Sequence, residues 1–487
     1  AEGVNKMPVN RTITSEILVA YSQCPRKAFL IFCTDENGIP HEYVRILERH
    51  KKANRRIYLS ELNQKMPHIQ DYDVCFLQGG SDMIINATLR SEGLEAGCDL
   101  LTKLEASSSL GEHSYEPTIC VGTHSVSKEQ RLELFFAGYV LAQIQDKVPA
   151  AGRIIIKGQR SRKVKLENSG KTLVPLLEDL REWVAASPPE PPPLILNKHC
   201  PLCRFYSLCR AKAEQEDHLS LLDRISTPKA VQKYEKKGIF TVKQLSYLYK
   251  PRRRKKRTRN PPKPIYKPEL QALAIRTGKI YLQELPELSR QPVELFLDIE
   301  GIPDQQLYYL IGLLVCEADT SEYHSYWADS PGDETRIWQQ FLAKVNEHPD
   351  APIYHYGSYE PRAIARLSRR YDTDDRDLKD LLINVNSYIY AKMYFPVRSN
   401  RLKEIGNFIG AAWRSPDASG LQSLVWRHYW EVTGDVRYRQ LLMDYNEDDC
   451  QALKLLTDEL IRIKHSADIL LEVDFADEPK RHATKDG

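Results

Sequence analysis

The sequence predicts an α/β protein with at least two domains. The chain has 487 residues, more than a single hydrophobic core usually organises. Hydrophobic residues make up 42% of it and charged residues 28%, a balance typical of globular proteins. Apolar runs of strand length alternate with helical patterns, which is the order expected around an α/β sheet.

The composition also narrows the setting in which the protein works. The longest apolar run, residues 307–316, is about half of what a bilayer span needs. No charged-then-apolar secretory segment opens the chain. Ten cysteines in a chain of this length do not form a disulfide scaffold. We therefore expect a cytoplasmic protein without membrane association.

The basic residues are unevenly distributed. The net charge is only +3, but residues 250–263, KPRRRKKRTRNPPK, hold nine basic residues and no acid. The rest of the chain therefore carries a net charge of −6. We call this segment the basic strap. It suits a polyanion, most simply nucleic acid, and a solvated interdomain linker is the alternative.

The first 215 residues read as a mixed helix and strand unit. Apolar residues recur at helical spacing over 15–32. Turn residues separate the expected strands, and the tract 187–193, SPPEPPP, is a stiff extended spacer. Strands are expected at 72–78, 82–89, 95–105 and 114–122, and a helix at 129–144.

After this unit come a helical connector and a second α/β region. Residues 217–249 read as two short helices, with Gly238 as a C-cap and Thr241 at the start of the second. The last twenty residues are charged and are expected to be a loose tail. Strands are expected at 294–301, 307–317, 324–329 and 351–355, and helices at 333–347, 360–370 and 438–464.

Three cysteines are unusually close in sequence. Cys200, Cys203 and Cys209 form C-x2-C-x5-C, a spacing at which thiolates converge on a metal or a cluster. A four-sulfur site needs one more ligand. Cys24, about 176 residues upstream in SEILVAYSQCPR, is the candidate.

One early cysteine before Pro-Arg, paired with a late C-x2-C-x5-C, resembles the iron–sulfur RecB-like nucleases, which include the CRISPR-adaptation nuclease. The resemblance implies a PD-(D/E)xK restriction-endonuclease-like fold over residues 8–215. It also implies a [4Fe–4S] cluster that clasps the two ends of the domain together, with structural zinc as the alternative. The implied cluster ligands are Cys24, Cys200, Cys203 and Cys209.

The nuclease site of that family is incomplete in this sequence. Asp99 follows Gly97 as the family's first acid does, and Glu116 lies on the next expected strand. The E-x-K lysine is missing there, and Phe135 replaces the glutamine four residues before Tyr139. Metal-dependent hydrolysis needs acids for the metal and a lysine for the attacking water. We therefore expect this domain to bind DNA with little cutting, unless Lys128 moves into the site.

A second set of acids lies in the C-terminal region. Asp298 and Glu300 alternate along an apolar strand, so both point to one face. Two carboxylates on one face repel unless a cation lies between them. Tyr445 and Asp449, spaced i and i+4, share a face of the expected C-terminal helix.

A strand D-x-E followed about 150 residues later by Y-x-x-x-D resembles the DEDD 3′–5′ exonucleases of the DnaQ-like, RNase H-fold superfamily. A similar exonuclease domain follows a RecB-like domain in a bacterial family. The resemblance implies two Mg²⁺ or Mn²⁺ ions about 4 Å apart, bound by Asp298, Glu300 and Asp449, with Tyr445 orienting the water. Glu360, in HYGSYE, takes the middle acidic position. Asp377 and Asp380 are alternatives to Glu360, and Asp448 is the alternative to Asp449.

Together these features predict a metal-dependent DNA-processing exonuclease whose RecB-like domain grips the nucleic acid. Single-stranded DNA fits best, RNA stays open, and a helicase or another DNA-processing protein is a candidate partner. The alternative is an inactive nucleic-acid-binding assembly subunit with a structural cluster. We expect a RecB-like domain at 8–215, a helical connector with the basic strap at 216–265, an exonuclease domain at 266–467 and a charged tail at 468–487. The expected nucleic-acid contacts are Arg252, Arg253, Arg254, Lys255, Lys256, Arg257 and Lys403.

Overall fold

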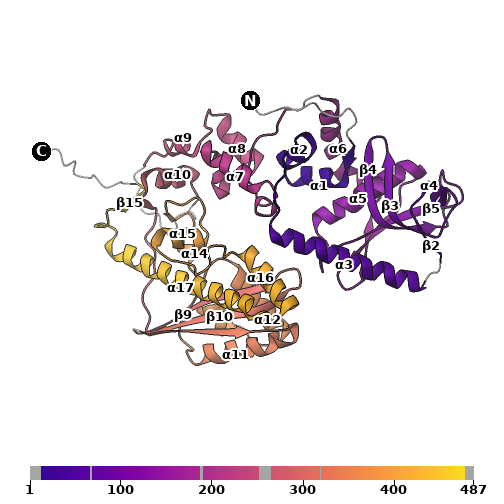
Figure 1. Ribbon diagram of the computed structural model, residues 1–487. Helices are drawn as coiled ribbons and strands as arrows, with labels where there is room; N and C mark the ends of the chain where they lie inside the picture. The colour runs from indigo at the N-terminus through magenta and orange to yellow at the C-terminus, as the bar shows by residue number, and fades with distance from the viewer. Residues whose placement is uncertain are drawn as a thin grey trace. The chain divides into compact units, whose positions relative to one another are not determined.

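The computed structural model describes residues 12–65, 68–186, 190–251, 265–318, 320–374 and 376–477, with the side chains of 376 and 377 left out. The chain divides into two compact units, residues 1–210 and 211–487 (Figure 1). Each unit has its own sheet and its own hydrophobic core.

The N-terminal unit is built on a seven-stranded sheet. Its order is β2-β3-β4-β5-β6-β7, with β1 (Ile13–Thr14) added to β4. Neighbours β3, β4 and β5 are antiparallel, and β5 and β6 are parallel. The strands are β2 (Ile69–Asp71), β3 (Met83–Ser91), β4 (Leu94–Leu104), β5 (Ser114–Cys120), β6 (Ala151–Ile156) and β7 (Arg160–Lys165).

Helices cover this sheet and join its ends. The helix α5 (Lys128–Gln145) packs on β3 to β6 and carries much of the buried core. The long helix α3 (Glu42–Lys65) lies against the end of β5, where a Cβ on Gly122 would fall 2.6 Å from the α3 backbone. The other helices are α1 (Ser15–Gln23), α2 (Pro25–Cys33), α4 (Val74–Gln78), α6 (Gly170–Ala185) and α7 (Tyr206–Gln215).

Two expected elements of this unit are wrong. The strand predicted at 72–78 is mostly the helix α4, because the Asp73 carboxylate caps it by accepting the Cys75 backbone N–H at 2.8 Å. The single helical pattern over 15–32 is two helices. They break at Cys24, whose extended backbone precedes a proline in the first position of α2.

The C-terminal unit begins with the helical connector. The helices α8 (Pro228–Glu235) and α9 (Val242–Ser246) lie at the two predicted places, and Thr241 caps α9 as expected. The helix α8 ends at its C-cap Lys236, two residues before the predicted Gly238, which takes the positive φ of 75°. The next helix, α10 (Pro268–Thr277), follows the strap.

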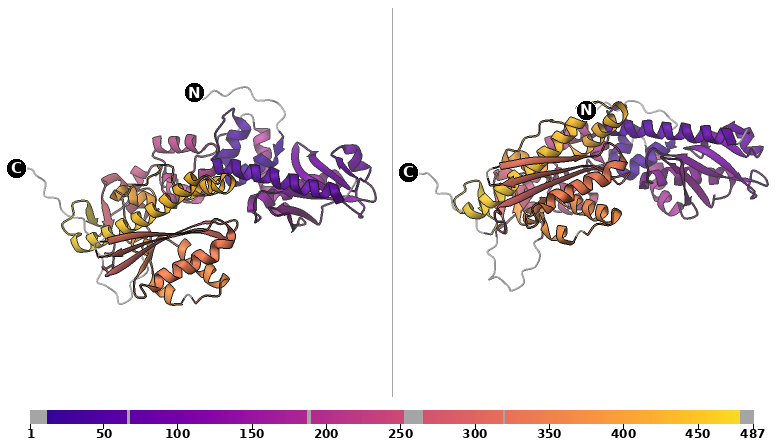
Figure 2. Two further views of the ribbon diagram at one scale, coloured as in Figure 1. Left: turned by 60° about the horizontal axis from the view of Figure 1, so that its bottom comes forward. Right: turned by 90° about the horizontal axis from the view of Figure 1, so that it is seen from below.

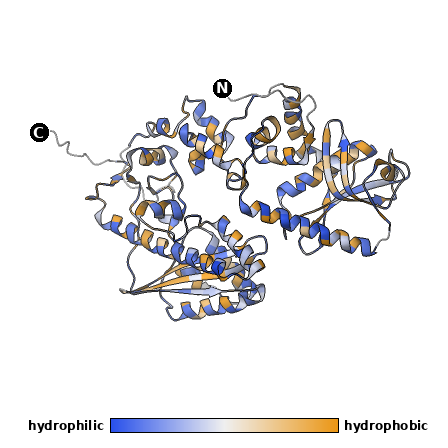
Figure 3. Ribbon diagram, viewed as in Figure 1, coloured by the Kyte–Doolittle hydropathy of each residue, from blue (hydrophilic) through white to orange (hydrophobic). Residues whose placement is uncertain are grey.

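The central sheet of this unit has the order β11-β10-β9-β12-β13. The first three strands are antiparallel, and β9, β12 and β13 are parallel. Figure 3 shows these inner strands as largely hydrophobic, as expected for a sheet covered on both faces. The strands are β9 (Val293–Ile302), β10 (Leu307–Glu317), β11 (Thr320–Trp327), β12 (Ile353–His355) and β13 (Leu382–Asn384).

Helices pack on both faces of this sheet. In Figure 2, α11 (Glu334–Asn346) and α12 (Tyr359–Arg370) lie on one side, and the long α17 (Val436–Ser466) crosses the other. The strands and helices predicted for this region are confirmed, with boundaries that differ by a few residues. The remaining helices are α13 (Arg376–Leu381), α14 (Asn386–Ile389), α15 (Leu402–Ile409) and α16 (Gly420–Thr433).

A small second sheet corrects the prediction of a loose tail. Its order is β14-β8-β15, from β14 (Met393–Tyr394), β8 (Ile280–Leu282) and β15 (Val473–Phe475). Val473 is fully buried, so its burial holds this part of the predicted tail in place. Residues 478–487 lie outside the described residues. None of the described helices is long and apolar enough to cross a membrane.

Candidate functional site

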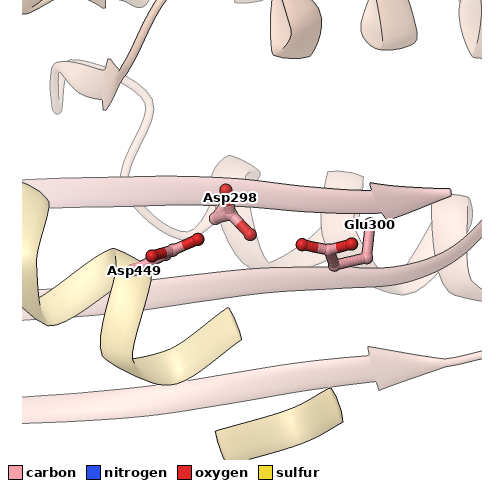
Figure 4. A group of neighbouring side chains, drawn as sticks. All are labelled: Asp298, Glu300 and Asp449. Atoms are coloured by element: carbon pink, nitrogen blue, oxygen red, sulfur yellow. The ribbon is translucent and has the colours of Figure 1, made fainter. Parts of the chain in front are cut away.

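Three carboxylates meet on the face of the C-terminal sheet that α17 covers. Asp298 and Glu300 point to the same face of β9, and Asp449 reaches them from α17 (Figure 4). One oxygen of each lies within 4.8 Å of those of the other two. Burial raises the pKa of Asp298 well above its ordinary value, and the neighbouring carboxylates add to this effect.

A buried amide holds Asp298 in place. The Asn446 side chain is fully buried and donates to Asp298 Oδ2 at 2.6 Å and to the Asp298 backbone oxygen at 3.1 Å. Its own oxygen accepts a hydrogen bond from the Tyr323 hydroxyl at 2.7 Å. The space exists because position 312 is glycine, whose Cβ would fall 1.5 Å from Asn446 Oδ1. Sequence reasoning missed this network.

Glu300 is buried beside two hydroxyl groups. Ser423 Oγ donates to Glu300 Oε2 at 2.9 Å, and the Tyr309 hydroxyl does so at 3.5 Å. Burial, followed by the charge of Asp449, raises the pKa of Glu300 to about 8. A carboxylate in this position favours a counter-cation.

Asp449 is held by its helix and by an indole. Trp413 Nε1 donates to Asp449 Oδ1 at 2.7 Å, and the Tyr445 hydroxyl, one turn earlier, also bonds this carboxylate. Burial still raises the pKa of Asp449 to about 7. The competing Asp448 is bound by Arg414, whose Nε lies 2.8 Å from its Oδ1. Asp449 is therefore the acid that joins the cluster.

The middle acid is Glu360, in the first turn of α12. Its side chain is buried, and its charge adds to the raised pKa of both Asp298 and Glu300. Of the competing residues, Asp380 is exposed and the Asp377 side chain lies outside the described residues. Glu360 is thus close to the cluster, as the sequence predicted.

The cluster of Asp298, Glu300 and Asp449 fits a divalent metal ion. Mg²⁺ and Mn²⁺ prefer hard carboxylate oxygens, and raised pKa values mean that the cluster accepts positive charge readily. Asp298, Glu300 and Asp449 would hold the ion.

The nucleic-acid contacts expected of Lys403 and the basic strap stay predictions. Lys403 donates to the backbone oxygen of Ala418 at 2.5 Å and lies 5.5 Å from the Trp413 ring centroid. Its charge lowers the pKa of Asp449, although burial dominates. The ammonium group therefore supports the loop beside the cluster. The six strap residues, 252–257, lie outside the described residues.

The four cysteines expected to act together line one cavity of the N-terminal unit. Burial, with smaller contributions from Cys24, Cys203 and Cys209, raises the pKa of Cys200 to about 11. Backbone N–H groups point to two of the sulfurs: that of Asn197 to Cys200 at 3.1 Å, and two in the first turn of α2 to Cys24. Such donors stabilise thiolates.

The spacing of these sulfurs bears on the choice between zinc and a larger cluster. In tetrahedral zinc sites the sulfurs are about 3.8 Å apart, from a Zn–S bond of about 2.3 Å. Within the described residues, no three of the four sulfurs lie within 4.8 Å of one another. In this structure the four sulfurs are therefore not drawn together as closely as the ligands of one tetrahedral zinc ion.

The N-terminal acids are not brought together. Glu116 pairs across the strands with Thr102, three residues along β4 from Asp99, and forms an ion pair with Arg153. Asp99 instead pairs with Arg55 at 2.5 Å and accepts the Cys120 backbone N–H. The cation beside Asp99 is thus a side chain of α3.

A half-buried lysine accompanies this arginine. Lys51, one turn before Arg55 on α3, pairs with Glu133 at 2.9 Å. Burial lowers the pKa of Lys51, but Glu133 and then Asp99 raise it above its ordinary value. Lys128, which the sequence offered in place of the missing E-x-K lysine, is the first residue of α5. The signal in the sequence for this pair of cations was the spacing of Lys51 and Arg55, which places both on one helix face.

Comparison with known proteins agrees with the fold of the C-terminal unit. Residues 295–461 match the RNase_H superfamily. This range contains the three acids of the cluster, as well as Glu360 and Tyr445. The chain therefore carries a C-terminal RNase H-like domain, and nucleases with this fold use divalent metals. A search of curated proteins finds no match to the chain.

Proposed function

We propose that the chain is a Mg²⁺- or Mn²⁺-dependent nuclease that removes nucleotides from the 3′ end of single-stranded DNA. The observation that carries the proposal is the carboxylate cluster Asp298, Glu300 and Asp449 inside an RNase H-like domain. Three closely spaced acids with raised pKa values, one buried and two half-buried, are unfavourable without a cation, so a protein that keeps them gains from binding one.

Each side chain has a role in phosphodiester hydrolysis. Asp298, Glu300 and Asp449 bind the metal, which when bound stabilises negative charge on the reacting phosphate oxygens. Tyr445 bonds Asp449 through its hydroxyl and orients the attacking water. Glu360 contributes the fourth carboxylate, in place of the aspartate of related exonucleases.

The surroundings of the site suit an unpaired strand end. The Tyr359 ring is 38% exposed at the start of α12, and its hydroxyl lies close to Gly301 on β9. An exposed ring beside a metal site offers a stacking surface for a terminal base. The basic strap, with Arg252 to Arg257, attracts the sugar–phosphate backbone.

The N-terminal unit serves as a RecB-like grip with a [4Fe–4S] cluster. The β3-β4-β5-β6 order, with α5 between the two parallel strands, suits a PD-(D/E)xK-like fold. The convergence of four cysteines on one cavity supports a cluster. Arg55 neutralises Asp99, so this unit contacts DNA rather than cutting it. A helicase or another DNA-processing protein supplies the single strand.

The test compares the wild-type chain with Asp298→Asn on single-stranded DNA and RNA of one sequence, with Mn²⁺. We expect the wild type to release nucleoside monophosphates from DNA and Asp298→Asn to release none. Binding of DNA without cleavage by either protein would favour the second candidate, an assembly subunit. The Arg55–Asp99 pair in the N-terminal unit is the observation that favours it.

A further inference from the structure

Two buried polar atoms beside the carboxylate cluster lack hydrogen-bond partners. They are His355 Nδ1 and Glu360 Oε2, and they lie 3.7 Å apart. The two residues are 2% and 5% exposed. A buried polar group without a partner is destabilising, so native proteins rarely keep one without a reason. Two such atoms 3.7 Å apart need only a small side-chain movement to become each other's partner.

The backbone between the two residues fixes their positions. His355 ends β12, which is parallel to β9, and α12 begins four residues later at Tyr359. The turn contains Gly357 with φ 96°, and the Gly357 N–H donates to Asn384 Oδ1 at 3.0 Å. A turn anchored in this way presents both side chains without further rearrangement.

A favourable helix dipole does not explain Glu360. A carboxylate in the first turn of a helix is stabilised by the dipole even when it is exposed, so the dipole does not require burial. Titratable groups close to Glu360 include His355, Asp298 and Glu300, and two of these three are acids. The burial therefore adds repulsion, which a bound cation relieves.

We propose that His355 is the positioning residue that orients Glu360 toward a divalent cation held by the cluster. Glutamate has one more rotatable bond than the aspartate of related exonucleases, so its carboxylate needs a partner to fix it. His355 is that partner, and the pair replaces a single short acid. This inference rests on the proposed metal-dependent function.

The test measures Mn²⁺ binding by the full chain without nucleic acid, by titration calorimetry and by the Mn²⁺-induced rise in melting temperature. We expect His355→Asn and Glu360→Gln each to weaken binding about 10–100-fold, as loss of a ligand's partner does. The double variant should bind no more weakly than the weaker single variant, since both changes remove one ligand. His355→Gln gives a second variant if the first folds poorly.

The matched control is His348, another histidine beside a glutamate. His348 Nδ1 lies 3.3 Å from Glu317, and its Nε2 is also buried without a partner. Glu317 pairs with Val293, five residues or about 17 Å along β9 from Asp298. His348→Asn should bind Mn²⁺ as the wild type does.

A second control separates the two proposals. Asp298→Asn should lose the Mn²⁺ site altogether. If His355→Asn binds Mn²⁺ like His348→Asn while Asp298→Asn does not bind, the role of His355 is overturned and the metal site stands. If Asp298→Asn also binds Mn²⁺ like the wild type, the metal site itself is overturned, and the proposed function with it.

Discussion

Replacing Asn446 by alanine tests how the fold holds its first acid. The change removes both hydrogen bonds to Asp298 and the acceptor of the Tyr323 hydroxyl. Asn446 is fully buried, so water does not replace these bonds without rearrangement. The Tyr323 hydroxyl and the Asp298 carboxylate would then remain in the site without the amide that bonds them.

The expected magnitude follows from these contacts. One unpaired hydroxyl and one weakened carboxylate cost about 1–3 kcal/mol each, so Asn446→Ala should lower the free energy of unfolding by about 2–6 kcal/mol. Metal affinity should fall about 10–100-fold, because the partner that orients a ligand is lost. The stability loss should be larger with Mg²⁺ than without, since a protonated Asp298 needs the amide less.

Urea unfolding with and without Mg²⁺ measures both effects. Gln451→Ala is the matched control, because Gln451 is exposed on the same helix α17. If Asn446→Ala unfolds like Gln451→Ala and binds Mg²⁺ like the wild type, the amide does not position Asp298 and the reasoning fails.

Four further outcomes follow. Gly312→Ala should reproduce the Asn446→Ala phenotype, because its Cβ would displace the amide; unchanged Mg²⁺ affinity would contradict this. Burial raises the pKa of Glu300 from 4.5 to about 8, so the folded metal-free chain holds a proton that the unfolded chain releases. Its melting temperature should therefore fall as pH rises from about 4.5 to 8, and Mg²⁺ should reduce that fall; a rise would refute the burial argument. Cys203→Ser should lower bound iron and acid-labile sulfide in anaerobically purified protein, and full retention would count against the cluster. Arg55→Gln should leave cleavage intact but lower the stability of the N-terminal unit, because it strips Asp99 of its partner; a melting temperature equal to that of the wild type would show that the pair is dispensable.

The sequence predicted the elements whose signal is local. The strand at 307–317 is an almost continuous apolar run, and the strand at 293–302 is apolar apart from its three acids, which is enough to indicate a buried strand. Asp298 and Glu300 were found because alternation along a strand fixes the face of a side chain, and Asp449 because four residues make one helical turn. Periodicity therefore placed each set of residues on one face of its own element, and the resemblance to the DEDD exonucleases predicted that the two elements meet.

Features that depend on contacts distant in sequence were missed. Asn446 bonds Asp298 across 148 residues and needs a glycine on a third element, which no local pattern indicates. Arg55 reaches Asp99 from a helix whose packing on the sheet the sequence does not fix. The segment of α4 was predicted as a strand from its β-forming side chains. It is a helix because a single carboxylate cap outweighs those side chains over five residues.

The central claim is that hydrolysis takes place at the C-terminal carboxylates. The most direct measurement compares wild type, Asp298→Asn and Asp99→Asn on 5′-labelled single-stranded DNA with Mn²⁺. We predict a ladder that shortens from the 3′ end for wild type and Asp99→Asn, and intact DNA for Asp298→Asn. Cleavage that survives in Asp298→Asn and disappears in Asp99→Asn would contradict the account and place the chemistry in the N-terminal unit.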